Sequence, residues 1–246
     1  MTPVSFERIT EHIYRLEVPF RVLGPVNVPV CAWLIDHDQG WSLIDAGPPD
    51  SADTLVAAVR ELTEGQGVQR ILLTHAHFDH AGGLAALRRT WNPAVLCHRD
   101  EVPFVTGERS YRRQPPRRVA FWFGRFFLRA ERWQIPVARD LEAGQAADGM
   151  VVIHLPGHTP GQIGLLHPQD GAILCGDAVM NLRGRLSPPF SFATPDPGAT
   201  EASMLRLGEL DYEHLLPSHG PAILGTGRQA MLEFLDRRGT VEVASG

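Results

Sequence analysis

One short segment of the chain is dense in side chains that bind metal ions. Residues 74–80 read Thr-His-Ala-His-Phe-Asp-His, which places three imidazoles and one carboxylate within six positions. Such groups repel one another when protonated, and a divalent cation is the simplest partner that makes the cluster favourable. The helical zinc-protease pattern, two histidines four apart with a glutamate between them, is not present in this segment.

The residues around this segment predict how its ligands are divided. An apolar run at 71–73 predicts a strand that ends directly before the cluster. We expect the loop after that strand to turn His75 and His77 to one side. Asp79 and His80 would then point elsewhere, toward a second metal.

Other apolar runs also end at a histidine or an aspartate. The runs are 151–155, 172–175 and 215–216, and the residues that follow them are His158, Asp177 and His219. Two prolines and two glycines surround His158, which predicts a fixed loop that presents its imidazole. A single histidine after a strand is ordinarily a hydrogen-bonded surface residue, but several strand ends that all carry His or Asp indicate one shared site.

The order of these motifs resembles the metallo-β-lactamase superfamily of metal-dependent hydrolases. The resemblance rests on HAHFDH, GHTPG, GD and PSHG, with Leu43-Ile44-Asp45-Ala46-Gly47 before them, and spans roughly residues 27 to 225. It implies an α/β (α+β) fold, a four-layer αβ/βα sandwich in which two mixed β-sheets pack face to face with helices outside.

The resemblance also implies the ligands of two divalent ions, with zinc expected and iron or manganese as alternatives. One ion would take three imidazoles, the second would take a carboxylate and two imidazoles, and another carboxylate would bridge them. In that order the residues are His75, His77 and His158, then Asp79, His80 and His219, then Asp177.

The expected chemistry is hydrolysis by a hydroxide. Water that bridges two zinc ions loses a proton near neutral pH, so no Ser, Cys or Lys nucleophile is required. We assign Asp79 a catalytic role in receiving or orienting that proton. We expect Asp45 to accept a ring N–H from a ligand histidine and so fix its tautomer. From spacing alone, Asp45 fits a carboxylate in a strand-end turn equally well.

Length and composition fit one catalytic domain over residues 1–246. The chain is 43% hydrophobic and can bury a sizeable core without disulfides. Cys31, Cys97 and Cys175 are interpreted as small buried hydrophobes. Together with a start that lacks a secretory pattern, they predict a cytoplasmic protein. A net charge of −5 and the lack of a long apolar stretch predict no nucleic-acid or membrane partner.

Hydrophobic periodicity predicts the elements that carry these loops. Strands are expected at 13–18, 30–35, 41–44, 70–73 and 94–97, and helices at 53–62, 84–89, 202–210 and 228–238. Asp50 or Ser51 is the expected N-cap of the helix at 53–62.

Residues 109–132 differ from the rest of the chain. They hold eight arginines against one acid, and their apolar residues follow a helical period. We therefore predict an Arg/aromatic helical insertion at about 104–135 and assign Phe123 and Phe127 as substrate contacts. The alternatives are packing on the domain, a homodimer interface, a lid that attracts an anionic substrate, or contact with a membrane or nucleic acid.

Histidines outside the motifs are expected to be surface or structural groups: His12, His37, His98, His154, His167 and His214. His154 belongs to a strand run, so we expect its side chain to face away from the loop that carries His158. Cys175 is expected to lie deeper in its strand and not to be a ligand.

The expected substrate is a small-molecule ester, thioester or lactone. Glyoxalase II relatives carry a basic C-terminal extension, whereas here 26 residues follow Gly220 and the chain has no lysine. Met180 stands where lactonases often place a tyrosine. Transfer-RNA processing relatives use a long arm that we do not see, and true β-lactamases generally lack Asp79.

Phosphodiester hydrolysis is one alternative. Another is a persulfide dioxygenase of the same fold, which holds one iron in the manner of His75, His158 and Asp177.

Overall fold

Two β-sheets face each other in the computed structural model, which describes residues 5–23, 26–111 and 135–239. The seven-stranded sheet has, in spatial order, β1 (Glu7–Arg8), β2 (Ile13–Val18), β5 (Val30–His37), β6 (Gly40–Ile44), β7 (Arg70–Leu72), β8 (Ala94–His98) and β9 (Arg139–Leu141). The five-stranded sheet has β10 (Ala146–Ala147), β11 (Met150–His154), β12 (Ile163–His167), β13 (Ala172–Gly176) and β16 (His214–Pro217). Two small ribbons pair β3 (Arg21–Leu23) with β4 (Val26–Asn27) and β14 (Met180–Leu182) with β15 (Arg185–Ser187).

Both large sheets are mixed. In the first, β2, β5 and β6 are antiparallel, whereas β6, β7, β8 and β9 run parallel. In the second, β13 and β16 are parallel and the other neighbours are antiparallel. Parallel strands bring their carboxyl ends to the same edge of a sheet, so loops that follow them in the sequence can meet there.

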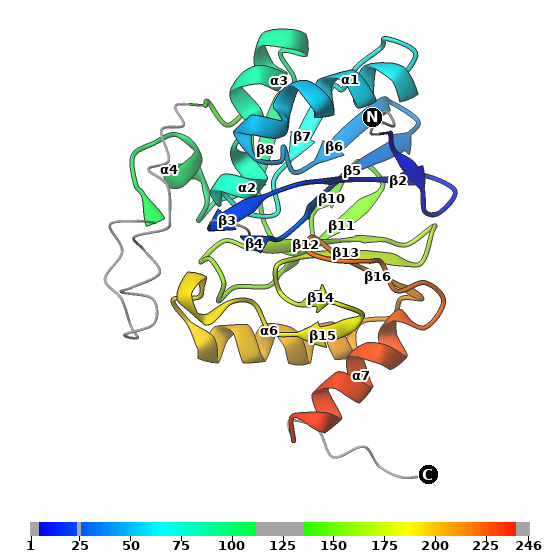
Figure 1. Cartoon of the computed structure of the whole chain (residues 1–246), viewed down its shortest axis with the longest axis vertical. Helices are drawn as coiled ribbons and strands as arrows, with labels where there is room; N and C mark the ends of the chain where they lie inside the picture. The colour runs from blue at the N-terminus through cyan, green and yellow to red at the C-terminus, as the bar shows by residue number, and fades with distance from the viewer. Residues whose placement is uncertain (1–4, 24–25, 112–134, 240–246) are drawn as a thin grey trace.

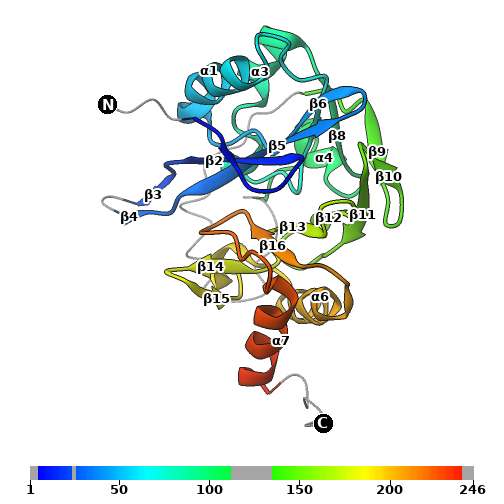
Figure 2. The same cartoon turned by 90° about the vertical axis from the view of Figure 1, so that its right-hand side faces the viewer.

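Helices cover the outer face of each sheet, which makes four layers. The first sheet carries α1 (Ala52–Leu62) and α3 (Leu84–Trp91), and the second carries α6 (Pro197–Glu209) and α7 (Gly227–Arg237) (Figure 1). Turning the molecule shows the same two helical layers on opposite sides of the sheets (Figure 2). The predicted αβ/βα sandwich is confirmed.

Strand β5 shows how the sequence builds these layers. Cys31, Trp33 and Ile35 face the second sheet, while Ala32 and Leu34 face the helical layer above. All five are buried, which is why this strand is a continuous apolar run rather than an alternating one. Full burial of each large apolar side chain contributes about 1.5–3 kcal/mol.

Three of the four predicted helices begin within one residue of the observed start, and α6 is the exception. Helix α6 begins at Pro197, five residues before the predicted start, because the Asp196 carboxylate accepts the Ala199 N–H at 3.1 Å and caps it. Ser51 does precede α1, but its hydroxyl donates to Pro48 O at 2.9 Å rather than capping the helix.

The Arg/aromatic segment lies largely outside the described residues, and so do Phe123 and Phe127. Its two ends are described. After α4 (Val102–Val105) the chain reaches Tyr111, which is buried in the outer core beneath α1 and α3. It returns at Ile135, whose N–H donates to Val105 O at 3.2 Å. The described residues on either side of this segment therefore both lie beside α4.

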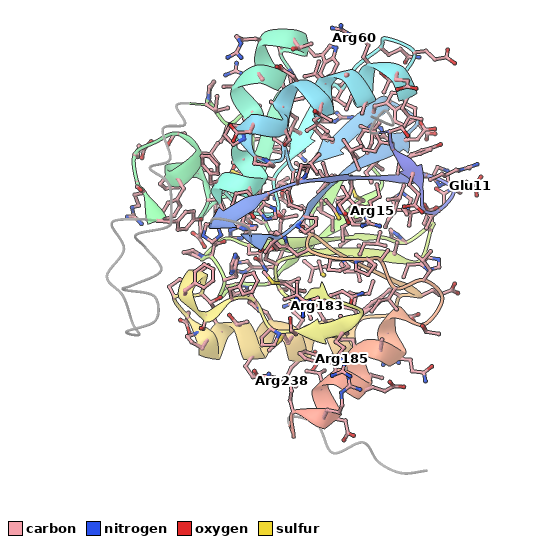
Figure 3. The ribbon with its side chains drawn as sticks, viewed as in Figure 1. Glu11, Arg15, Arg60, Arg183, Arg185 and Arg238 are labelled. Carbon is pink, nitrogen blue, oxygen red and sulfur yellow. The ribbon has the colours of Figure 1, made fainter. Side chains whose placement is uncertain are left out.

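The three cysteines are free and buried, as expected. Charged groups such as Glu11 and Arg60 project from the periphery (Figure 3). Within the described part of the chain, no helix combines the length and apolar character that a bilayer crossing requires.

A partly buried ion pair at the turn before β13 predicts a pH dependence of stability. The His12 Nδ1 lies 2.7 Å from Asp170 Oδ1, and this hydrogen bond raises the pKa of His12. Burial raises the pKa of Asp170, but hydrogen bonds from Thr10 and His12 outweigh it and lower that pKa. The contribution of His12 is lost as pH rises through its raised pKa, and that of Asp170 as pH falls through its lowered pKa.

We therefore expect wild type and His12→Gln to differ most in urea midpoint between pH 3.8 and 6.5, the ordinary pKa values of the two groups. The difference should shrink on either side. A difference that stays constant from pH 3 to pH 9 would contradict this.

Candidate metal centre

The predicted ligands meet at one edge of the sandwich, where strands of both sheets end. The HxH loop (residues 74–77) follows β7, and the GHTPG loop (residues 157–161) follows β11. Asp177 follows β13 and His219 follows β16. The two sheets are joined at this edge by backbone hydrogen bonds, from Ile163 N to Thr74 O at 2.9 Å and from Cys31 N to Ser218 O at 2.8 Å.

Three ring nitrogens form one half of the cluster, which we call the three-imidazole site. His77 Nδ1 lies 3.1 Å from His75 Nε2 and 2.9 Å from His158 Nε2. All three side chains are buried. One imidazole proton can serve only one of these contacts, whereas one cation can accept a lone pair from all three nitrogens.

The other half, the Asp79 site, contains Asp79, His80 and His219. His219 Nε2 lies 3.3 Å from Asp79 Oδ2, and His80 Nε2 lies 3.7 Å from the same oxygen. Asp79 and His80 belong to the short helix α2 (Phe78–Ala81), and the His80 ring lies 4.0 Å from that of His75, measured between centroids. The histidines of the 74–80 segment therefore lie in one continuous cluster, with His75 close to both His77 and His80.

Asp177 lies between the two halves. Its Oδ2 is 3.3 Å from His158 Nε2 and 3.4 Å from His219 Nε2, and its Oδ1 is 3.5 Å from His80 Nε2. One carboxylate therefore faces both groups of imidazoles, which is the position of a bridging ligand.

The outward nitrogens of four rings each face a hydrogen-bond acceptor. His80 Nδ1 lies 2.8 Å from Asp45 Oδ2, and His219 Nδ1 lies 2.8 Å from the carbonyl oxygen of Pro29. His158 Nδ1 lies 3.2 Å from the Thr194 hydroxyl, which itself donates to Phe190 O.

The fourth ring is that of His75, whose Nδ1 lies 3.1 Å from the Thr74 hydroxyl. Because this hydroxyl donates to Asp45 Oδ2, it accepts from the ring. In all four rings Nδ1 can therefore hold its proton toward the outward acceptor, which directs Nε2 to the centre of the site.

Burial and neighbouring charges lower the pKa values of three histidines of the site and raise that of a fourth. Burial lowers the pKa of His158 to about 4, and burial with neighbouring imidazoles lowers those of His75 and His77 well below their ordinary value. Burial also disfavours charge on His80, but Asp79, Asp177 and Asp45 raise its pKa to about 9. The three-imidazole site is thus neutral and rich in lone pairs, while the carboxylates favour positive charge beside it.

Two buried polar atoms show that the residues fit a cation. Within the described ranges, His80 Nε2 and Asp177 Oδ1 are buried without a hydrogen-bond partner. An unpaired buried imidazole nitrogen or carboxylate oxygen is costly, whereas both are ordinary ligands of a divalent metal. The donor set and its geometry therefore suit metal ions.

The backbone near the centre is constrained at Asp45 and at Gly220. Asp45 has φ +62, a left-handed conformation that aspartate tolerates better than most residues, and it aims the carboxylate at Thr74 and His80. Gly220 has φ +97, and a Cβ there would lie 1.8 Å from Asn181 O. Only glycine fits beside the ligand His219.

Two residues that the sequence excluded as ligands lie outside the cluster. His154 stacks on His98 with ring centroids 4.1 Å apart. The expectation that His154 faces away from the GHTPG loop is wrong, because its Nε2 lies 3.0 Å from Pro160 O at the outer side of that loop. Cys175 packs in the core beneath α6 and α7.

Several residues around the centre were not found by sequence reasoning. They are Thr74, Thr194, Pro29, Glu101 and Tyr111. Thr74 could have been noticed because it adjoins the histidine motif. The others come from segments with no motif, and Pro29 contributes only its backbone carbonyl.

Comparison with known proteins places the chain in a family. Residues 26–219 match the sequence model of the metallo-β-lactamase superfamily. The probable metallo-hydrolase YflN of Bacillus subtilis is 31% identical over 224 residues, 83% of this chain and 84% of its own length. The hydroxyacylglutathione hydrolase GloC of Haemophilus influenzae is 27% identical over 154 residues, 61% of this chain and 66% of its own length. The crystal structure of TTHA1623 in a di-iron-bound form is 31% identical, with a TM-score of 0.63 over 89% of this chain and 97% of that one.

The chain therefore belongs to the metallo-β-lactamase superfamily and is one of its metallo-hydrolases.

Proposed function

We propose that the chain is a dinuclear hydrolase that cleaves a small-molecule ester, thioester or lactone. The observation that carries the proposal is the place of Asp177, whose oxygens lie within 3.5 Å of ring nitrogens from both the three-imidazole site and the Asp79 site. A carboxylate shared in this way supports two ions rather than one. His75, His77 and His158 would hold the first ion, and Asp79, His80 and His219 the second.

Two bound divalent cations would lower the pKa of a water to near neutrality and polarise the carbonyl oxygen of the substrate. The protein supplies the rest. Asp45, Thr74 and the Pro29 carbonyl fix the tautomers of ligand histidines, so that no ring turns its N–H inward.

Asp79 is the carboxylate best placed to handle the proton of the attacking water. Its side chain is 13% exposed, whereas that of Asp177 is 3% exposed. Burial raises the pKa of Asp79, but His80 and His219 lower it to about 2, so the group is ionised and can accept a hydrogen bond. As water adds to the acyl carbon and the C–O or C–S bond breaks, Asp79 would orient the water's proton and pass it toward the leaving group.

The substrate class is supported by a relative and by one position in the chain. GloC is named for the hydrolysis of a glutathione thioester. Met180, three residues after Asp177, is buried at the start of β14 and offers no hydroxyl to a lactone. We therefore place esters and thioesters ahead of lactones.

The donor set is compatible with zinc, iron or manganese, since imidazole and carboxylate ligands suit all three. We propose zinc, and the di-iron form of TTHA1623 makes iron the next candidate. A small molecule is the only partner in this proposal.

Metal analysis combined with a substrate screen tests it. Protein purified without added metal should contain close to two divalent ions per chain and should cleave some p-nitrophenyl esters, thioesters or lactones. Removal of metal with a chelator should abolish turnover, and added zinc or manganese should restore it. Bis-p-nitrophenyl phosphate in the same screen tests for phosphodiester hydrolysis. One iron per chain, with oxygen uptake on glutathione persulfide, would instead establish the dioxygenase.

A further inference from the structure

A buried carboxylate outside the ligand set links the two loops that form the three-imidazole site. Glu101 lies between β8 and α4, and its side chain is completely buried. Enclosing a carboxylate costs several kcal/mol unless hydrogen bonds compensate, so such a group calls for a specific role.

Each carboxylate oxygen of Glu101 accepts a backbone hydrogen bond from a different loop. Glu101 Oε2 accepts the N–H of Ala76 at 2.8 Å, and Ala76 stands between the ligands His75 and His77. Glu101 Oε1 accepts the N–H of Gly161 at 2.9 Å, at the end of the GHTPG loop that carries His158. One side chain therefore spans two loops that lie far apart in the sequence.

Tyr111 adds a third contact to the same carboxylate. Its hydroxyl donates to Glu101 Oε2, and its ring packs edge-on against the His77 ring with centroids 4.7 Å apart. The ring also stacks on Phe104 of α4, with centroids 3.9 Å apart. The carboxylate, the tyrosine and the ligand His77 thus form one packed unit.

The distance that these contacts control is the one between His77 and His158. Their ring nitrogens lie 2.9 Å apart, yet one belongs to the HxH loop and the other to the GHTPG loop. A backbone hydrogen bond from Ile163 N to Thr74 O joins the first residue of the HxH loop to the second sheet. Glu101 adds a second link farther along the same loop, at Ala76, which stands between the two histidines.

We propose that Glu101 is a positioning residue that holds the HxH and GHTPG loops at the spacing a metal ion needs in the three-imidazole site. The inference rests on the proposed function only in that this site binds metal. Burial raises the pKa of Glu101, against hydrogen bonds from Tyr111, Ala76 and Gly161 that lower it. These donors are what keep the carboxylate an acceptor at both loops.

Two substitutions disturb this link by different routes. Glu101→Gln keeps the size of the side chain but turns one acceptor into an N–H group, which then faces the N–H of Ala76 or Gly161. Gly161→Ala leaves Glu101 in place, but the new Cβ would lie 2.8 Å from Glu101 Cγ and 2.8 Å from Glu101 N, so the loop or the carboxylate must shift. Tyr111→Phe removes only the third contact.

A buried carboxylate elsewhere in the fold provides a matched control. Asp170 is also buried and accepts hydrogen bonds from Thr10 and from the backbone and ring of His12. It precedes β13, whereas Asp177 follows that strand, so Asp170 lies at the end away from the metal centre. Asp170 lies with His12 and His167 in a separate group of possible metal ligands, so Asp170→Asn should lower stability without affecting metal binding at the three-imidazole site.

The experiment measures zinc affinity of the metal-free full-length chain by competition with a chromophoric chelator, together with the visible spectrum of the cobalt-substituted protein and the Tm. Loss of a group that orients ligands typically weakens metal binding by about 10–100-fold. We expect that loss for one of the two zinc ions in Glu101→Gln and in Gly161→Ala, with an altered cobalt spectrum. Tyr111→Phe should lose less, and Asp170→Asn should match wild type in affinity and spectrum despite a lower Tm.

Wild-type zinc affinity in both Glu101→Gln and Gly161→Ala would overturn the proposal, whatever their Tm, because Glu101 would then act on stability alone. If Glu101→Gln does not fold, Gly161→Ala decides. A wild-type chain that binds no zinc, iron or manganese would overturn both this proposal and the hydrolase. Zinc binding without turnover of any screened substrate would overturn only the hydrolase, and the affinity difference would still support the role of Glu101.

Discussion

Asp177→Ala is expected to lose most of its bound metal and nearly all turnover. The substitution removes the carboxylate that faces both halves of the centre and leaves His158, His219 and His80 without the negative charge between them. Changes to residues that merely orient ligands typically cost 10–100-fold, so loss of a bridging ligand should exceed about 100-fold in turnover. The metal content of the purified variant measures the first loss, and its kcat/KM on the best screened ester or thioester measures the second.

His154→Ala is the matched control for this variant. His154 is the histidine nearest in sequence to the GHTPG loop, yet it stacks on His98 and contacts only the outer side of the loop, at Pro160 O. It should keep both metal and turnover. Equal losses in the two variants would show that the assignment of ligands is wrong.

Asp45→Ala is expected to destabilise the protein by about 3–5 kcal/mol, the usual cost of removing one partner from a buried charged pair. Asp45 is completely buried and accepts from Thr74 N, the Thr74 hydroxyl and His80 Nδ1, each at 2.8 Å. Alanine leaves three donors without an acceptor and places a residue less suited to φ +62 at this turn. Urea unfolding of the metal-free protein measures the change.

Asp45→Asn separates the effect of the left-handed backbone conformation at this position from the effect of the carboxylate charge. Asparagine tolerates the same left-handed conformation and can still accept from Thr74 N, but its amide cannot accept well from both Thr74 and His80. We expect a smaller loss of stability than for alanine, with metal affinity about 10–100-fold weaker because the proton of His80 is no longer held on Nδ1. Stability equal to wild type in Asp45→Ala would contradict the role given to this carboxylate.

The features of the fold and site that could be predicted are those that depend on short contiguous segments of the sequence. Continuous apolar runs such as 30–35 predicted buried strands, and the ligand residues stand directly after such runs. Because a strand end fixes where the next few side chains go, the run ending at residue 73 predicted that the motif at 74–80 lies at the edge of a sheet.

The cap of α1 and the start of α6 were less predictable. Ser51 and Asp50 have the right type to cap α1, but the Ser51 hydroxyl turns to Pro48, while Asp196 caps α6. Residue type makes a cap available, and the path of the preceding chain decides whether the side chain reaches the helix.

The sequence by itself determined the class of fold, the family and the residues that could hold metal. Each follows from short contiguous motifs and from the periodic pattern of apolar residues. Only the tertiary structure decided which groups position those ligands. Thr194, the Pro29 carbonyl and Glu101 make hydrogen bonds to site histidines or to the loops that carry them, from segments whose local sequence is ordinary. Burial is the reason: away from water every polar atom needs a partner, and that partner is whatever the packed chain brings within about 3 Å, which no spacing along the sequence records.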